Sequence, residues 1–257
     1  MSKNITIAYF SPGGTTKEIA EIAAAAITAD VKHVDLMAST ITDDMHFGTD
    51  DLLIVAMPVF AGRIPAVCPD MLQKLKSTGA TAISIAVYGN RDFDDALLEM
   101  SDLLQESGFH VVGAAAFIAR HSIFPNVAKD RPDADDKDEI VRFAKACSEK
   151  VENSRPPASA LEISGNRPYK EAGAMPIRPR GKKKSCTGCN VCVEICPVQA
   201  ISKTAPTKTD KEKCITCMAC VYHCPAKSRG LHTPLYPIAK GQFEKQCAAR
   251  REPTAIV

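Results

Sequence analysis

Tryptophan is absent from the 257 residues, and aromatic residues make up only 5% of the chain. Long apolar segments are missing too, since no run approaches the roughly 18 residues that a membrane-spanning helix needs. The first ten residues lack the apolar region and the cleavage site of a secretory signal peptide. From these absences we expect a cytoplasmic protein with no membrane span.

Two nucleotide-binding motifs are also lacking around the first glycine-containing turn, residues 11–16. No lysine stands where G-x-x-x-x-G-K-[ST] would place one, and the spacing is not that of G-x-G-x-x-G. Hydrolysis of a nucleoside triphosphate and binding of a dinucleotide through these motifs are therefore not expected.

The net charge of +2 conceals two parts of opposite sign. Residues 1–177 contain 17 Lys and Arg against 25 Asp and Glu, whereas residues 178–257 contain 15 against 5. Such a division favours two domains with different roles. The basic run 178–184 could bind nucleic acid, form a solvated linker, ease the reduction of an anionic cofactor, or dock on the acidic domain. We expect no nucleic-acid partner.

Apolar periodicity predicts an α/β domain. Strands are expected at 3–10, 31–36, 52–57, 81–87 and 111–119, and helices at 15–29, 66–76, 92–107 and 137–151, with one irregular turn within 37–50. Apolar strands that alternate with helices favour a parallel sheet covered on both faces, in the flavodoxin-like doubly wound arrangement of five strands. We therefore predict a domain at 1–152, a proline-rich linker at 153–184, and a second domain with a C-terminal tail at 185–257, which includes a short helix at about 242–251.

Cysteine is concentrated in the second domain, where C-x2-C-x2-C-x3-C-P occurs twice with an offset of 28 residues. The cysteines of the repeat are Cys186, Cys189, Cys192 and Cys196, then Cys214, Cys217, Cys220 and Cys224. Cysteine at every third residue lets one tight loop bind three corners of a four-iron cluster, while the fourth cysteine points away. Structural zinc is the alternative, but zinc ribbons usually show isolated cysteine pairs. Cys68, Cys147 and Cys247 lie outside the repeat, and we interpret them as packing or surface thiols.

Three loops follow predicted strands and meet at one edge of the sheet, where ligands bind in open α/β folds. Their candidate cofactor-binding residues are Ser11, Pro12, Gly13, Gly14, Thr15, Thr16, Pro58, Val59, Phe60, Ala61, Gly62, Tyr88, Gly89, Asn90, Arg91 and Phe93. The first loop opens a helix, whose free N–H groups attract phosphate. The other two bring aromatic faces suited to a flat ring. A fourth loop, 120–126, could cover that ring, and its His121 is a weaker candidate for a functional role.

The motifs Tyr-Phe-Ser-Pro-Gly-Gly-Thr-Thr, Pro-Val-Phe-Ala-Gly-Arg-Ile-Pro and Tyr-Gly-Asn-Arg-Asp-Phe-Asp-Asp-Ala resemble flavodoxin. With the cysteine repeat, the chain resembles the flavodoxin–ferredoxin fusion family of anaerobic prokaryotes. The resemblance implies noncovalent FMN, with its phosphate on 11–16 and its ring between 58–62 and 88–93. It also implies a small α+β ferredoxin domain with two [4Fe–4S] clusters. The usual flavodoxin phosphate loop has a hydroxyl residue where Pro12-Gly13 stands, and Phe60 is left as the candidate for stacking on the flavin.

Resemblance to bacterial two-cluster ferredoxins implies a crosswise ligand assignment. One cluster would take Cys186, Cys189, Cys192 and Cys224, and the other Cys214, Cys217, Cys220 and Cys196.

We therefore expect an electron carrier or FMN/iron–sulfur oxidoreductase that relays electrons between the clusters and FMN. Its partners would be a low-potential donor and an acceptor reductase, and no residue need act as a general acid or base. The alternative is a flavin-dependent reductase with its own small-molecule substrate. A redox-sensing or nucleic-acid-binding module is the third hypothesis.

Overall fold

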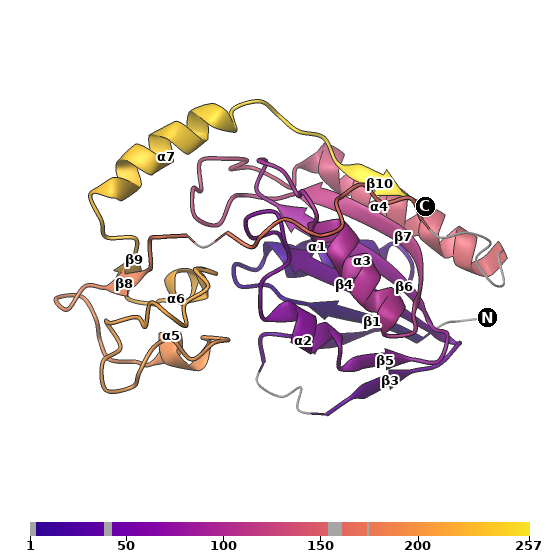
Figure 1. Cartoon of the computed structure of the whole chain (residues 1–257), viewed down its shortest axis with the longest axis horizontal. Helices are drawn as coiled ribbons and strands as arrows, with labels where there is room; N and C mark the ends of the chain where they lie inside the picture. Colours follow the sequence, from indigo (N-terminus) through magenta and orange to yellow (C-terminus); the bar gives the residue numbers. More distant parts are fainter. Residues whose placement is uncertain (1–3, 39–42, 154–160, 174) are drawn as a thin grey trace.

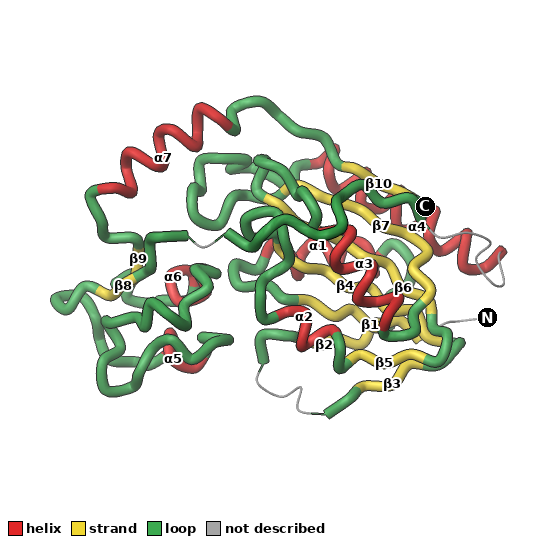
Figure 2. Tube along the Cα trace, in the orientation of Figure 1, coloured by secondary structure: helices red, strands yellow, loops and turns green. Residues whose placement is uncertain are grey.

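The computed structural model describes residues 4–38, 43–153, 161–173 and 175–257. Figure 1 shows a twisted sheet with helices on both faces and, beside it, a smaller part. The smaller part contains β8 (Arg180–Gly181), α5 (Val191–Glu194), α6 (Ala219–Tyr222) and β9 (Arg229–Gly230). We call residues 180–230 the cluster domain, and Figure 2 shows that most of it is loop. Within the described ranges, no helix is long and apolar enough to cross a membrane.

The main sheet contains all five predicted parallel strands. They are β1 (Asn4–Tyr9), β2 (Val31–Asp35), β4 (Asp51–Pro58), β6 (Thr81–Tyr88) and β7 (His110–Ile118). The strand order is β10-β7-β6-β4-β1-β2. Counting only the parallel strands, this is the order 2-1-3-4-5 of the flavodoxin-like doubly wound fold, which confirms the predicted fold class.

Helices cover both faces of this sheet. On one face lie α1 (Thr15–Ala25) and α4 (Ala134–Asn153), whose apolar side chains pack with those of the central strands. On the other lie α2 (Cys68–Leu72) and α3 (Ala96–Glu106). All eight residues of β6 are buried, as expected for a strand between two helical layers. We call this sheet and its helices the flavodoxin-like domain.

A small second sheet was not predicted. It pairs β3 (Met45–Phe47) with β5 (Leu75–Ser77) in parallel. The helix predicted at 66–76 therefore ends early, because its last residues bond to a neighbouring strand instead of continuing the helix. The irregular turn predicted within 37–50 is replaced in part by β3, and residues 39–42 lie outside the described ranges.

The C-terminal tail returns to the flavodoxin-like domain. Helix α7 (Leu235–Gln246) precedes β10 (Thr254–Ile256), which pairs antiparallel with β7 and adds a sixth strand to the sheet. The helix predicted at about 242–251 is thus misplaced: α7 ends at Gln246, and the carbonyls of Cys247 and Ala249 bond to the side chain of Asn90 instead of continuing the helix. Pairing also covers an edge strand that would otherwise expose unpaired backbone groups.

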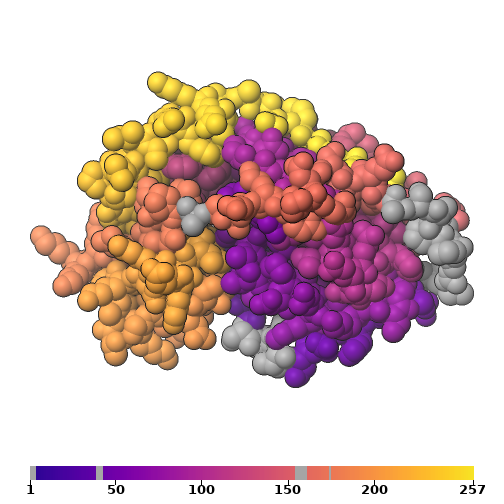
Figure 3. Space-filling view, viewed as in Figure 1, coloured from indigo at the N-terminus to yellow at the C-terminus, as the bar shows by residue number. Residues whose placement is uncertain are grey.

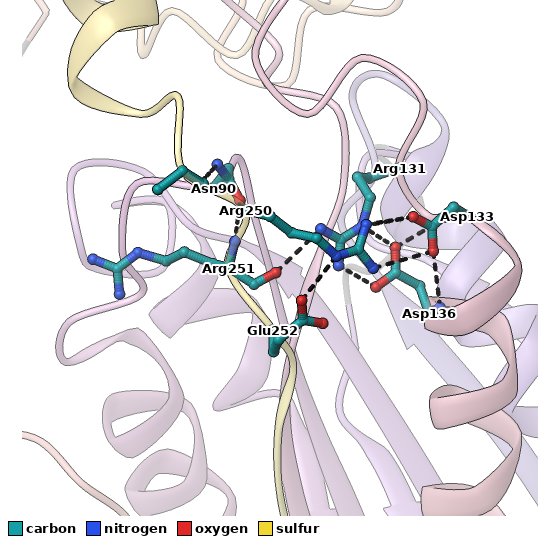
Figure 4. A network of polar contacts seen from close by, with 8 residues as sticks. Asn90, Arg131, Asp133, Asp136, Arg250, Arg251 and Glu252 are labelled. Carbon is teal, nitrogen blue, oxygen red and sulfur yellow. Dashed lines mark hydrogen bonds and ion pairs between the residues drawn. The ribbon is translucent and has the colours of Figure 1, made fainter.

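A polar network fastens this tail (Figure 4). Arg131, only 8% exposed, pairs with the buried carboxylate of Asp136 and donates from Nη1 to the backbone oxygen of Arg251 at 3.1 Å. Arg250 pairs with Asp133 at 2.6 Å, and this guanidinium is the main reason that the pKa of Asp133 lies well below its usual range. Arg131, through the backbone of Arg251, and Asp133, through the side chain of Arg250, therefore hold the C-terminal tail against the flavodoxin-like domain.

The linker lies along α3 before it reaches the cluster domain. Asp95, at the start of α3, accepts hydrogen bonds from the backbone N–H groups of Asn166 and Lys170 at 2.8 and 2.7 Å. Near the middle of α3, Asp102 accepts hydrogen bonds from Arg167 and Tyr169. These contacts direct the following residues along the boundary between the two domains (Figure 3).

Candidate functional site

A cavity of about 890 Å³ lies where the strand-end loops face the cluster domain. Eleven of the sixteen predicted cofactor-binding residues line it: Pro12, Gly13, Thr15, Thr16, Pro58, Val59, Phe60, Ala61, Tyr88, Gly89 and Arg91. The structure thus brings the three loops together, although they are far apart in the sequence. The other five, Ser11, Gly14, Gly62, Asn90 and Phe93, do not line the cavity.

The first loop shapes the start of α1. Ser11 does not line the cavity, and its Oγ accepts a hydrogen bond from the N–H of Lys17 at 2.9 Å. Gly14 has φ of +90°, which suits glycine, and it stands immediately before the helix. Thr15 and Thr16 are the first helical residues, so their N–H groups lack intrahelical acceptors. These free donors and two hydroxyl groups border the cavity.

The second loop is held by hydrogen bonds between the backbones of Phe60 and Arg63, at 2.8 and 3.2 Å. Gly62 has φ of +89°, and an added Cβ would collide with the carboxylate of Asp94. Glycine is therefore required there for backbone shape, while Phe60 faces the cavity. Behind the loop, Arg63 pairs with the buried Glu99 at 2.6 Å.

The third loop places Tyr88 at the cavity, with burial raising the pKa of its phenol to about 12. Phe93 packs edge-on against Tyr88, with ring centroids 5.6 Å apart, so it supports the cavity wall from behind. Asn90 turns its amide toward the C-terminal tail instead of the cavity. An added Cβ at Gly89 would come within 2.5 Å of His121, so the third and fourth loops are in close contact.

The fourth loop, 120–124, also lines the cavity, as the sequence suggested. His121 accepts at Nδ1 from the N–H groups of Ile123 and Phe124, both at 3.1 Å. Its ring packs against Phe243 of α7, with centroids 4.7 Å apart. Burial, together with the nearby Arg91, lowers the pKa of His121 to about 4. His121 is thus neutral near pH 7 and holds the shape of its loop.

Sequence reasoning missed two further walls of the cavity. One is the linker, including Lys170 and the stretch 175–178, and the other is α7, through Gln242, Phe243 and Gln246. No motif marks these residues, because only the tertiary course of the linker and tail brings them to the sheet edge. The basic run does not pair with the acidic domain: Lys182, Lys183 and Lys184 are exposed and form no ion pair within the described ranges.

The two copies of the cysteine motif also share their backbone conformation. Positive φ angles recur at positions 28 apart: Gly188 and Thr216 at 71° and 55°, Asn190 and Met218 at 60° and 67°, and Gln199 and Lys227 at 51° and 46°. Both fourth cysteines accept a backbone N–H at 3.3 Å, from Ala200 to Cys196 and from Ser228 to Cys224. The two loops therefore present their thiols in the same way.

The thiols are grouped across the two copies of the motif. Burial first, and then the neighbouring thiols of Cys220, Cys196 and Cys214, raise the pKa of Cys217 to about 12. Cys196 belongs to the first copy, whereas the others belong to the second. All eight thiols are free of disulfides. Among the described residues, no three His, Cys, Asp or Glu side chains surround a single mononuclear metal position.

The second cluster loop reaches the cavity itself. Cys214 and Cys217 line it together with Tyr222, which follows on α6. The hydroxyl of Tyr222 donates to the backbone oxygen of Ser122 at 2.8 Å. A Cβ at Gly13 would lie 3.4 Å from the ring of Tyr222, which is an ordinary van der Waals distance, so that ring lies directly beside the first loop. One cavity wall is therefore built from a cluster loop.

Comparison with known proteins identifies the second part of the chain. Residues 185–228 match the sequence model of a 4Fe–4S dicluster domain. No curated protein matches the chain.

Several solved structures resemble the chain. Rubredoxin oxygen:oxidoreductase from the anaerobe Desulfovibrio gigas is 16% identical, with a TM-score of 0.44 over 59% of this chain and 37% of that one. A flavodoxin from the domain Archaea is 16% identical, with a TM-score of 0.44 over 58% and 99%. Fusobacterium nucleatum flavodoxin bound to flavin mononucleotide is 16% identical, with a TM-score of 0.42 over 58% and 98%.

The strand order of the sheet and the match at residues 185–228 agree with the family resemblance predicted from the sequence. The chain thus joins a domain with flavodoxin-like strand order to a segment that matches a 4Fe–4S dicluster domain.

Proposed function

We propose that the protein is an electron-transfer flavoprotein that relays electrons between two [4Fe–4S] clusters and FMN, and on to a partner redox enzyme. One observation carries this proposal: the three strand-end loops and the thiols Cys214 and Cys217 line the same cavity. A flavin held by the loops would share that cavity with ligands of one cluster. No acid–base residue is needed for this function.

The residues at the cavity fit FMN. The free N–H groups and hydroxyls of Thr15 and Thr16 at the start of α1 suit a phosphate. Phe60 and Tyr88 offer aromatic surface for the ring system. The volume of about 890 Å³ lies within the usual range for cofactor sites. When bound, FMN supplies chemistry in steps of one or two electrons, which joins single-electron carriers to a two-electron acceptor.

The thiols fit two four-iron clusters ligated crosswise. The grouping of Cys196 with Cys214, Cys217 and Cys220 supports one set. The other set would be Cys186, Cys189, Cys192 and Cys224, whose loop has the same backbone angles. Thiolates bind iron in such clusters, and the short tight loops leave room for inorganic sulfide.

The two proposed sets of cysteines differ in solvent exposure. One cluster would therefore lie nearer the surface and the other nearer the flavin. Cys214 and Cys217 line the cavity, whereas Cys189 is exposed and does not line it. Lys182, Lys183 and Lys184 precede Cys189 on an exposed turn. We infer that an acidic redox protein docks at these three lysines, so that electrons pass through the exposed cluster, then the cavity-lining cluster, to the flavin.

The composition of the protein tests the proposal. Protein prepared without oxygen is expected to contain about eight iron and eight sulfide per chain with one releasable FMN, and to show a cluster spectrum that bleaches on reduction. Colourless protein that contains zinc would contradict the cluster assignment. Protein with clusters but no affinity for FMN would contradict the flavin assignment.

A second function is favoured by the fourth loop. Arg120, His121 and Ser122 line the cavity in addition to the flavin loops, so a small acceptor could bind beside the ring. In that case the protein would be a flavin-dependent reductase supplied by its clusters. An anaerobic screen of quinones, nitroaromatics and tetrapyrroles separates the two functions, because a pure relay would reduce none of them with saturation kinetics.

A further inference from the structure

At one buried position, the two halves of the cluster domain carry side chains of opposite character. Ala200 and Ser228 are equivalent in the 28-residue repeat, and both donate a backbone N–H to the preceding fourth cysteine at 3.3 Å. The next residue is Ile201 in the first half and Arg229 in the second. A guanidinium thus stands where the internal symmetry of the domain calls for an apolar side chain.

Both residues lie against the same two thiols. Ile201, 4% exposed, packs in an apolar cluster with Cys192 and Cys220. Arg229, 5% exposed, places Nη1 4.0 Å from the sulfur of Cys192. Burial raises the pKa of the thiols of Cys192 and Cys220, and the charge of Arg229 opposes the rise in both. Under the crosswise assignment these two cysteines belong to different clusters.

The charge of Arg229 is held in place but not neutralised. Its guanidinium donates to the backbone oxygens of Pro206 and Pro179, the latter at 3.1 Å, and to the hydroxyl of Thr209. Within the described ranges no carboxylate pairs with it, and its buried Nε has no hydrogen-bond partner. A buried charge without a counter-ion is costly, so its position beside the thiols calls for an anionic group there.

We propose that Arg229 raises the reduction potential of both clusters. This rests on the proposed function, because it requires two clusters in the crosswise arrangement. Each cluster becomes more negative by one charge on reduction, and a fixed cation a few ångströms from one ligand of each stabilises that reduced state in a partly buried site. Electrons from a donor would therefore be accepted at a potential that two symmetric apolar halves could not provide.

A purely structural role for Arg229 makes a different prediction. If the guanidinium only ties Pro179, Pro206 and Thr209 together, its replacement would alter stability and cluster retention but leave the potentials of loaded protein unchanged. Potentials measured on loaded protein therefore separate the two roles.

The test uses full-length protein loaded with clusters, with potentials measured by redox titration followed by electron paramagnetic resonance. Arg229→Ile copies the residue of the other half, Arg229→Lys keeps the charge, and Thr209→Val removes one anchor without changing charge. We expect Arg229→Ile to disfavour reduction of both clusters by at least about tenfold, which is about 59 mV for one electron. Arg229→Lys should lose less than half of that shift, and Thr209→Val should match the wild type.

Equal potentials in wild type and Arg229→Ile would overturn the proposal, and so would an equal fall in Arg229→Lys and Arg229→Ile. If Arg229→Ile does not retain clusters, Arg229→Gln replaces it in the comparison with Arg229→Lys, under the same criterion. Wild-type protein without any cluster signal would instead contradict the proposed function, which the iron and sulfide analysis reports separately.

Discussion

The side-chain amide of Asn90 holds three backbone groups of the C-terminal tail, including the carbonyl of Cys247. Its Nδ2 donates to that oxygen at 2.9 Å and to the oxygen of Ala249 at 2.8 Å, while its Oδ1 accepts from the N–H of Arg251 at 3.1 Å. Asn90 is 5% exposed and has φ of +63°, a conformation that asparagine tolerates better than most residues. One residue of the third cavity loop thereby holds the segment that immediately follows α7, a helix that lines the cavity.

Replacing Asn90 with alanine should release this tail. The buried carbonyl of Cys247, the partly buried carbonyl of Ala249 and one N–H would lose their partner, and we expect the free energy of unfolding to fall by about 2–4 kcal/mol. Guanidine denaturation measures the loss, and limited proteolysis after Arg250 or Arg251 locates it. Asn126→Ala, at an exposed position, is the matched control. Tail cleavage as slow in Asn90→Ala as in the control would show that Asn90 does not hold the tail.

His121 predicts a pH dependence of stability. Its pKa is about 4 in the folded protein, below the ordinary value of 6.5, because burial disfavours the charged ring. As the pH falls from 6.5 toward 4, the unfolded chain binds a proton that the folded chain does not. Stability is therefore complete above pH 6.5 and decreases by roughly 3 kcal/mol on acidification to pH 4.

The variant His121→Phe lacks this titration and isolates its contribution. As the pH falls from 7 toward 4, the wild type should lose roughly 3 kcal/mol of stability relative to His121→Phe, which denaturation at each pH measures. A difference that stays constant between pH 7 and 4.5 would mean that His121 is not buried in its neutral form.

Cys196 provides the test of crosswise ligation. Under the proposed crosswise assignment, Cys196→Ala would remove one ligand from the cluster bound by Cys214, Cys217 and Cys220, although these three belong to the other copy of the motif. We expect reduced iron content and loss of the resonance from the cluster nearest the flavin. Cys147→Ala removes a buried thiol that lies outside the repeat and should retain both clusters. Loss of the cluster bound by Cys186, Cys189 and Cys192 instead would reverse the assignment.

The exposed lysines that precede the first cysteine motif predict how the protein receives electrons. Changing Lys182, Lys183 and Lys184 together to glutamine should slow reduction by an acidic ferredoxin at least tenfold at low ionic strength, with little effect at high salt. The control carries the same change in charge on the flavodoxin-like domain, as Lys32→Gln, Lys129→Gln and Lys145→Gln combined. Stopped-flow absorbance reports both rates. Equal slowing in the two triple variants would rule out a specific docking surface.

The sequence predicted those features that depend on local pattern. Apolar strands alternating with helices identified the five parallel strands, and the 28-residue offset identified the cluster loops, because each element carries its own periodicity or spacing. The position of the C-terminal tail could not be predicted from a local pattern. The strand Thr254–Ile256 is only three residues long, and its position depends on the free edge of β7 and on the amide of Asn90.

The cavity likewise contains residues that a local pattern predicted and residues that only the tertiary structure brings there. Loops at the carboxyl ends of parallel strands meet at one edge for topological reasons, so most of their residues could be assigned from the sequence. The contributions of Gln242 and Phe243, and of the linker from Lys170 onward, arise from tertiary contacts without a sequence motif. Arg229 was visible only as a break in the repeat, which gained meaning once its burial was known.

Intramolecular electron transfer tests the central claim most directly. Protein loaded with FMN and clusters is mixed without oxygen with a one-electron donor, and cluster and flavin absorbance are followed together. The account predicts that the clusters are reduced first and that the flavin is then reduced at a rate independent of protein concentration. Flavin that stays oxidised beside reduced clusters, or that is reduced equally fast when Cys214 and Cys217 are replaced by alanine, would contradict it.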